Sequence, residues 1–429
     1  MDGAAQTAAA RTPPAPGKPT FHHIFANSEF RALWLAQLLS VAGDQLARVA
    51  ITVLVYDRTR SPFWTALTYA VTLLPWVVGG LALSGLADRL PRRQVMVACD
   101  IARLVLVGVM ALVSLAAPPE TELWILVALL FAVTLLDSPF KSARSAMMPD
   151  ILTGERYVLG TAVTQTTFQV GVVAGYALGG LVVAFLGVRT ALLVDAATFA
   201  VSAVLIWFWV RHRPAAASQA GSRPSRFAEM AAGVRLVFGH STLRTLILFG
   251  WLVAFYEVPM GLAAPYASSL HASLAIPIST GLVFAAGPFG TAVGAVVFGR
   301  MVPPAARQRW MGPMAIAACG VLLFCALHPG LIGALLIIAL SGTCASYQLA
   351  ANAAFVAAVP AERRGQAFGL ANGGMQVTQG LWIVLAGATA TSAAVTPAVA
   401  IAVSGGLGAA LAAALAMTWR QASGLTDGH

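Results

Sequence analysis

The chain has 429 residues, of which 59% are hydrophobic and only 10% are charged, and its formal net charge is +10 at pH 7. A soluble domain carries about 25% charged residues, so this composition excludes an ordinary soluble protein and indicates an integral membrane protein. The arginines recur in short loops between apolar runs and do not form one basic domain. We therefore expect a lipid bilayer as a partner and no nucleic acid.

The first apolar run begins at Phe30, after an Ala- and Pro-rich segment that lacks the apolar centre of a signal peptide. Because about 20 apolar residues span a bilayer core, each such run is a predicted membrane helix. We expect twelve, over 30–55, 64–86, 95–117, 123–145, 158–186, 189–210, 243–267, 278–301, 309–327, 330–357, 366–390 and 395–419. Ten or eleven spans stay open as an alternative if one pair of runs is re-entrant.

A hydrophilic stretch over 211–241 divides these runs into two sets of six. Its second part carries apolar residues at helical spacing, which predicts an amphipathic helix on the inner membrane surface. The expected organisation is a disordered cytoplasmic tail (1–29), a six-helix bundle (30–210), a cytoplasmic linker (211–241), a second six-helix bundle (242–419) and a cytoplasmic tail (420–429).

Positive residues are distributed unevenly among the loops. With the N-terminus inside, the outer loops hold little beyond Arg58, Arg60 and Arg189, and all other loop arginines fall on the inner side. Because positive residues favour the cytoplasmic side of a membrane protein, the sequence predicts that both termini are cytoplasmic.

The loop Ser84–Arg93 places one carboxylate, Asp88, beside the guanidinium groups of Arg89, Arg92 and Arg93. Asp88 could accept hydrogen bonds from the first amides of a facing helix, which favour an anion by about 0.3–1 kcal/mol. Anchoring of the loop at the inner surface would explain the arginines but not the aspartate. We favour a latch that holds neighbouring helices.

This loop and the opening segments Phe30–Trp34 and Ser40–Asp44 resemble the major facilitator superfamily, in particular its bacterial drug-efflux and siderophore-export branch. The resemblance extends to Trp419, and the loop departs from the family signature at Ser84 and Pro91. It implies an all-α integral membrane fold with twelve transmembrane helices in two pseudo-symmetric six-helix bundles, in a bacterial plasma membrane. It also implies that the loop latches the outward-facing state.

A second resemblance lies in the run 158–186, where small residues recur at four-residue spacing. The motif is similar to the glycine-rich antiporter motif of exporters, and Tyr176 stands where that motif has proline. Glycines at this spacing let a neighbouring helix backbone approach closely, so ordinary helix packing is an equally good interpretation. The residues concerned are Gly171, Gly175, Gly179 and Gly180.

Four acids fall inside predicted spans, although a charge at the bilayer centre costs about 2.5–3.5 kcal/mol. Asp44 and Arg48 are the first candidates for proton coupling, because they continue a polar stripe that begins at Gln37 along one helix. The alternative is that Asp44 and Arg48 form a purely structural ion pair. Glu257 is the second candidate, and its alternative is a protonated acid that is hydrogen-bonded to a neighbouring span.

The other two acids are assigned structural positions. The family likeness implies that Asp137 joins the charge network of the loop, with Arg92 as its partner. Asp195 is predicted to be a hydrated residue near the outer end of the run 189–210.

Uncharged amides also form stripes on several spans. Such groups can join helices through hydrogen bonds of about 0.6 kcal/mol each, but three stripes on different spans favour a polar substrate cavity. The candidates are Gln37, Gln165, Gln169, Gln348, Asn352, Gln376 and Gln379.

The sequence therefore predicts a secondary active transporter that exports small lipophilic drugs or natural products by alternating access, in exchange for protons. A uniporter, a proton-coupled importer of a small metabolite, and a non-transporting receptor on the same fold stay open. No GxxxxGK[ST] loop and no metal or nucleophile spacing occurs, which argues against a pump or an enzyme. The expected partners are a small-molecule substrate and protons. We expect a monomer without cofactor or metal.

Overall fold

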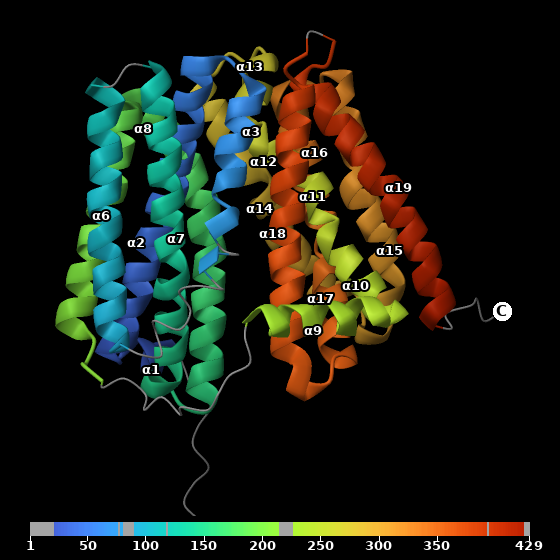
Figure 1. Ribbon diagram of the computed structural model, residues 1–429, viewed down its shortest axis with the longest axis horizontal. Coiled ribbons are helices and arrows are strands. Elements are labelled where there is room, and N and C mark those ends of the chain that lie inside the picture. Colours follow the sequence, from blue (N-terminus) through green and yellow to red (C-terminus); the bar gives the residue numbers. More distant parts are fainter. Residues whose placement is uncertain are drawn as a thin grey trace, which may run out of the picture.

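The computed structural model describes residues 21–75, 78–79, 90–116, 119–213, 226–392 and 394–423. In these ranges the chain is built from helices and contains no strand. Figure 1 shows two groups of helices side by side, with α1 to α8 in one half and α9 to α19 in the other.

The first half begins with a short helix over residues 21–25, in which Ile24 is buried against Phe30 and Met148, so the prediction of a disordered tail is wrong for residues 21–29. The side chain of Asn27 caps the next helix by accepting hydrogen bonds from the N–H groups of Glu29 and Phe30. The longest helix, α8, contains two predicted spans, because Gly187 (φ 82°, ψ 166°) leaves helical geometry and bends it between them. The helices are α1 (Phe21–Phe25), α2 (Ser28–Thr59), α3 (Pro62–Val71), α6 (Arg92–Ala116), α7 (Pro119–Ile151) and α8 (Glu155–Trp209).

The second half begins with the helix predicted in the linker, and then a broken helix of four segments covers the run 243–267. Its helices are α9 (Arg226–Gly239), α10 (Ser241–Trp251), α11 (Val253–Tyr256), α12 (Val258–Gly261), α13 (Ala263–Ser269), α14 (Ile276–Met301), α15 (Pro304–Gly320), η1 (Val321–Leu327), α16 (Gly330–Cys344), α17 (Tyr347–Ala358), η2 (Ala361–Arg363), α18 (Arg364–Thr389) and α19 (Pro397–Ser423).

Nine helices within the described residues are long and apolar enough to cross a membrane. One of these is α8, which holds two predicted spans. The predicted span 64–86 begins with α3, but its second part lies outside the described residues. Twelve spans therefore stay a prediction, as do the domain boundaries and the cytoplasmic position of the termini.

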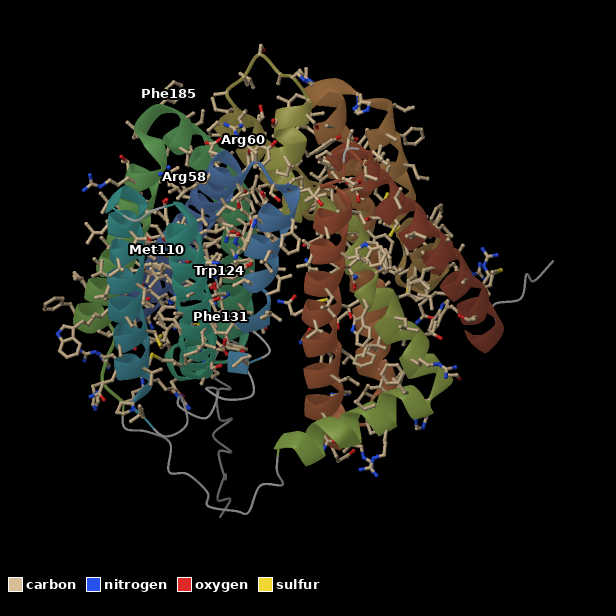
Figure 2. All side chains as sticks on the ribbon, turned by 45° about the horizontal axis from the view of Figure 1, so that its top comes forward. Arg58, Arg60, Met110, Trp124, Phe131 and Phe185 are labelled. Carbon is tan, nitrogen blue, oxygen red and sulfur yellow. The ribbon has the colours of Figure 1, made fainter. Side chains whose placement is uncertain are left out.

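Side chains of three helices contact one another at one end of the first half, the end that lies away from α9. Arg58 of α2 forms an ion pair with Glu122 of α7 at 3.5 Å. The rings of Trp64 and Trp124 meet edge to face at 5.0 Å. Arg58 lies at the same end as Phe185 of α8 (Figure 2). These contacts join α2, α3 and α7 at this end.

The two halves are in close contact at this same end, opposite α9 (Figure 1). Gly180 of α8 meets Gly281 of α14 so closely that a Cβ on Gly281 would lie 2.6 Å from the carbonyl oxygen of Tyr176. A Cβ on Gly180 would lie equally close, 2.6 Å, to the carbonyl oxygen of Pro277. The pair of glycines is therefore what allows the two helix backbones to touch here.

Candidate substrate and proton site

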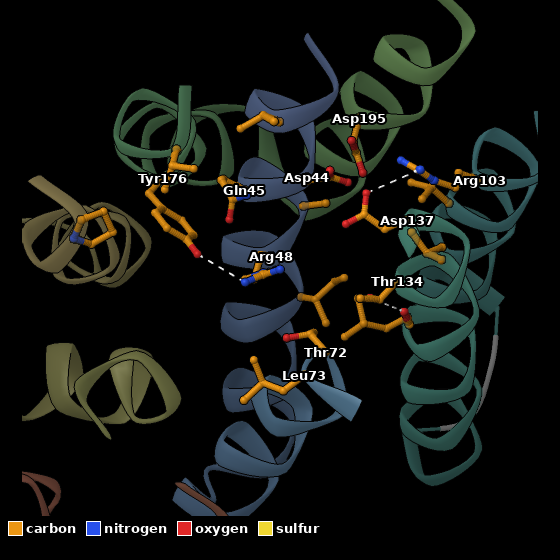
Figure 3. A pocket seen from close by; sticks show the side chains of 18 of the residues that line it. Asp44, Gln45, Arg48, Thr72, Leu73, Arg103, Thr134, Asp137, Tyr176 and Asp195 are labelled. Atoms are coloured by element: carbon orange, nitrogen blue, oxygen red, sulfur yellow. Dashed lines mark hydrogen bonds and ion pairs between the residues drawn. The ribbon is translucent and has the colours of Figure 1, made fainter. Parts of the chain in front are cut away.

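A cavity of 380 Å³ lies beside α2 and reaches the interface between the halves. The first half supplies most of its wall, and the second half contributes Glu257, Pro288, Thr291 and Gln376. Figure 3 shows the part around α2. Seven ionisable side chains other than tyrosine line it, namely Asp44, Arg48, Arg103, Asp137, Lys141, Asp195 and Glu257.

Asp44 and Arg48 lie one turn apart on α2 but point to different sides of it (Figure 3). Arg48 donates a hydrogen bond to the hydroxyl of Tyr176 at 3.5 Å, and its guanidinium lies 5.8 Å from the centre of the Tyr69 ring. Asp44 is turned toward Asp137 and Asp195. Within the described residues no ion pair joins Asp44 to Arg48, so the structural ion pair is wrong.

Asp195 is buried, with 1% of its surface exposed, and it packs against the α2 turn that contains Gly43. The prediction of a hydrated residue near the membrane surface is therefore wrong. Asp195 lies eight residues after the bend at Gly187, which corresponds to about 12 Å along the helix axis, and it is therefore deeper in the helix bundle than predicted. Asp195 and Asp44 consequently line the same cavity.

Asp137 is the most strongly paired acid of the cavity. Its carboxylate contacts Lys141 at 2.5 Å and Arg103 at 3.6 Å. Arg92 instead contacts Asp150 at 2.8 Å and donates to the carbonyl of Ala146. The predicted pair of Asp137 with Arg92 is wrong, because Asp137 lies about 20 Å along α7 from Asp150, at 1.5 Å per residue.

The remaining residues of the predicted latch are only partly described. Arg93 lies over the ring of Trp207, 4.6 Å from its centre, and donates to the carbonyl of Trp207. It therefore attaches the start of α6 to the end of α8. Asp88 and Arg89 lie outside the described residues, so the latch stays a prediction.

Two buried charges of α6 were missed by the sequence reasoning, which counted only four acids inside spans. Asp100 is fully buried and accepts a hydrogen bond from Ser202 at 2.5 Å. The guanidinium of Arg103 is held between the rings of Phe140 and Phe199, at 4.7 and 5.2 Å. The signal was present in the sequence, since Asp100 and Arg103 stand three residues apart within the predicted span 95–117.

Replacement of Arg103 by leucine is expected to lower the free energy of unfolding by about 3–5 kcal/mol, the usual cost of removing one partner of a buried ion pair. The change should appear as a lower thermal midpoint of the purified protein in detergent. Arg103→Lys retains the charge and should lower the free energy of unfolding by less. The exposed Arg60→Gln serves as the control, and an Arg103→Leu midpoint equal to that of the control would contradict the expectation.

Three glycines of the antiporter-like motif face α2 in the same half. A Cβ on Gly175 would lie 2.8 Å from the carbonyl oxygen of Ala42, one on Gly179 would lie 2.9 Å from the Cα of Leu46, and Gly171 is less tightly packed against α2. Gly180 is the member that faces the other half. These positions favour the interpretation as helix packing, and a role of the motif in antiport stays a prediction.

Tyr176, the residue in the place of the motif's proline, lines the cavity beside Arg48. Sequence reasoning treated it only as a departure from the motif. Gln45, also missed, is buried and lines the cavity, and its Oε1 atom has no hydrogen-bond partner among the described residues.

The amide candidates are divided between cavity and packing positions. Gln169 and Gln376 line the cavity. Gln379 donates a hydrogen bond to Glu257 at 2.6 Å. The other four are absent from the described cavity wall: Gln37 is buried, Gln165 and Asn352 are exposed, and Gln348 donates to the carbonyl of Gly250 and the hydroxyl of Tyr256.

Membrane-length helices in two halves, with a charged cavity that reaches their interface, are the architecture of an α-helical membrane transporter. Residues 33–345 match the family model of the Major Facilitator Superfamily. The chain therefore belongs to the Major Facilitator Superfamily, and it is a transporter and not an enzyme.

Curated relatives match over part of their length. The chain is 28% identical over 281 residues to the enterobactin exporter EntS of Citrobacter koseri, which covers 63% of each protein. It is 27% identical over 184 residues to the uncharacterized MFS-type transporter YkuC of Bacillus subtilis, which covers 43% of this chain and 42% of that protein. The match thus spans 42% to 63% of the length of these relatives.

Solved structures share the fold over almost the whole chain. The nucleoside transporter NupG superposes with a TM-score of 0.69 at 15% identity, covering 91% of this chain and 99% of NupG. A bacterial homologue of the iron transporter ferroportin superposes with a TM-score of 0.69 at 14% identity, covering 94% of this chain and 99% of that homologue. At these identities the likeness establishes the fold alone.

Proposed function

We propose that the chain exports a small lipophilic compound by alternating access and that protons move in exchange. One observation carries the proposal: Asp44 from the first half and Glu257 from the second half line a single cavity that reaches their interface. A movement of the halves relative to each other changes the surroundings of both acids together. Intramembrane acids of this kind are typical of proton relays in transporters.

Asp44 is the better of the two candidates for the proton-exchanging group. Within the described residues it has no hydrogen bond and no ion pair, whereas Asp137 is paired with two cations. Glu257 is held by Gln379 at 2.6 Å. A carboxylate that has no such partner and lies at a cavity can exchange a proton without first breaking an ion pair. We assign this role to Asp44 and a supporting role to Glu257.

The direction of transport is proposed from the relatives. The protein of Citrobacter koseri that is 28% identical to the chain is named an enterobactin exporter. Solved structures with the same fold include a nucleoside transporter and a member of the POT family, so the fold by itself favours neither direction.

The direction can be measured in a bacterial host that lacks its own efflux pumps. The chain is expressed, and the accumulation of fluorescent lipophilic compounds of both charges, including the cation ethidium and the carboxylate fluorescein, is compared with that in the empty host. Export predicts lower accumulation of at least one compound and its restoration by a protonophore. Higher accumulation would contradict export and indicate an importer. Unchanged accumulation of every compound, with the protein present in the membrane, would favour a receptor.

A further inference from the structure

Arg48 differs from the other two cations of the cavity because no carboxylate lies within 4.0 Å of it in the described part of the chain. Arg103 and Lys141 both contact Asp137. Arg48 donates one hydrogen bond among the described residues, from its Nη1 atom to the hydroxyl of Tyr176 at 3.5 Å. This distance is longer than the usual range of such bonds, about 2.7–3.2 Å. The guanidinium is therefore weakly satisfied.

A guanidinium carries five N–H donors in a planar fork that matches a carboxylate. Arg48 is partly exposed and lines the cavity (Figure 3). A cation that is held away from bulk water without a counter-charge is costly, so an anion that enters the cavity gains both a counter-charge and directed hydrogen bonds at this position.

Two tyrosine rings of the first half lie beside the same guanidinium, and a phenylalanine ring of the second half packs against both of them. The Tyr176 ring of α8 stacks on the Phe284 ring of α14 with centres 4.9 Å apart and planes at 14°. The Tyr69 ring of α3 lies 6.2 Å from Phe284 at 27° and 5.8 Å from Arg48. Of these three rings the Tyr176 ring lines the described cavity, so a flat apolar body beside the anionic group would meet the Tyr176 ring.

Asp44 points to a different side of α2 from Arg48 (Figure 3), and Glu257 forms no ion pair with Arg48 in the described part of the chain. Asp44 faces Asp137 and Asp195, where Arg103 and Lys141 supply positive charge. Glu257 accepts a hydrogen bond from Gln379. The cavity thus has an acidic end, where Asp44, Asp137 and Asp195 lie with the two cations Arg103 and Lys141. At its cationic end, Arg48 has no acid of the described cavity wall within ion-pair distance.

We propose that Arg48 binds the anionic group of the substrate, and that this substrate is a small carboxylate attached to an aromatic body. The assignment rests on the proposed transport function and specifies its substrate class. It differs from a cationic substrate, which would have to compete with Arg103 and Lys141 at the acidic end.

The test compares three compounds that share one ring system and differ only in the charge of the head group: naphthoate, naphthylmethylamine and naphthylmethanol. Binding to the full-length protein in lipid nanodiscs is measured by titration, with no pH gradient. Naphthoate is expected to bind more tightly than the amine and the alcohol. Arg48→Gln should weaken the binding of naphthoate by about tenfold or more, which is the range for a lost hydrogen bond to a charged group.

Two further variants keep the result interpretable. Arg60→Gln removes an exposed arginine just beyond the end of the same helix and should leave binding unchanged. Tyr176→Phe removes the hydroxyl but keeps the ring, and it should weaken the binding of naphthoate less than Arg48→Gln does. The thermal midpoint of each variant shows whether it is folded.

The inference is overturned if naphthoate fails to bind at millimolar concentration, if the amine binds more tightly, or if a folded Arg48→Gln variant binds naphthoate as the original chain does. These outcomes are independent of proton coupling. Naphthoate binding that depends on Arg48, without any proton movement, would uphold this inference and contradict the exchange mechanism. Proton-coupled export of the amine would uphold the exchange mechanism and contradict this inference.

Discussion

Replacement of Asp44 by asparagine is expected to reduce export to the level of the empty host while the protein still folds. Asparagine has nearly the same shape as aspartate, and no ion pair or hydrogen bond within the described residues is lost, since Asp44 has none. What the variant lacks is a group that can take up and release a proton. The thermal midpoint should therefore change little, whereas export driven by a proton gradient should disappear.

The measurement is accumulation of an exported compound in the pump-deficient host, together with the thermal midpoint of the purified variant. Asp57→Asn makes the same chemical change on the same helix, at an exposed position outside the cavity, and should export normally. Full export by a folded Asp44→Asn variant would return Asp44 to a structural role and leave Glu257 as the candidate.

Replacement of Gly281 by alanine is expected to shift the protein away from the state in which the halves touch at the end opposite α9. The new Cβ would lie 2.6 Å from the carbonyl oxygen of Tyr176 and 2.9 Å from the Cα of Gly180, so backbones must move apart. Overpacking of this kind costs about 1–3 kcal/mol, which corresponds to roughly a 5- to 150-fold change in the ratio of the two states.

The shift can be measured as a distance between spin labels on two exposed residues at this end, Phe185 of the first half and Leu274 of the second. The variant should populate longer distances than the original chain. Gly299→Ala is the matched control, because Gly299 is in the same helix and a Cβ there meets nothing within 4 Å. Equal distance distributions for Gly281→Ala and Gly299→Ala would contradict the role of this contact.

The positions of the helices could be predicted from the sequence because the length of an apolar run is fixed by the thickness of a bilayer. The predicted starts at 30, 278 and 395 correspond to helices that begin at Ser28, Ile276 and Pro397. The bend of α8 was also recognisable, since Gly187 separates two runs that are each long enough to span.

The pairing of charges could not be predicted in the same way. Hydropathy gives the depth of a residue but not the rotation of its helix about its own axis. Asp137 therefore received a partner on the basis of the family resemblance. Its contact with Lys141, one turn further along α7, could have been read from the spacing, whereas its contact with Arg103 depends on how α6 and α7 face each other. For the same reason Asp44 and Arg48, at favourable helical spacing, point to different neighbours.

The central claim is that substrate and protons move in exchange through a site that contains Asp44. It is tested most directly in proteoliposomes that enclose a pH-sensitive dye, with a pH gradient imposed and a compound identified by the accumulation assay added. We predict that the compound accelerates proton movement across the membrane with the original chain, and that the Asp44→Asn variant gives only the rate of empty liposomes. Transport of the compound without any accompanying proton movement would contradict the claim.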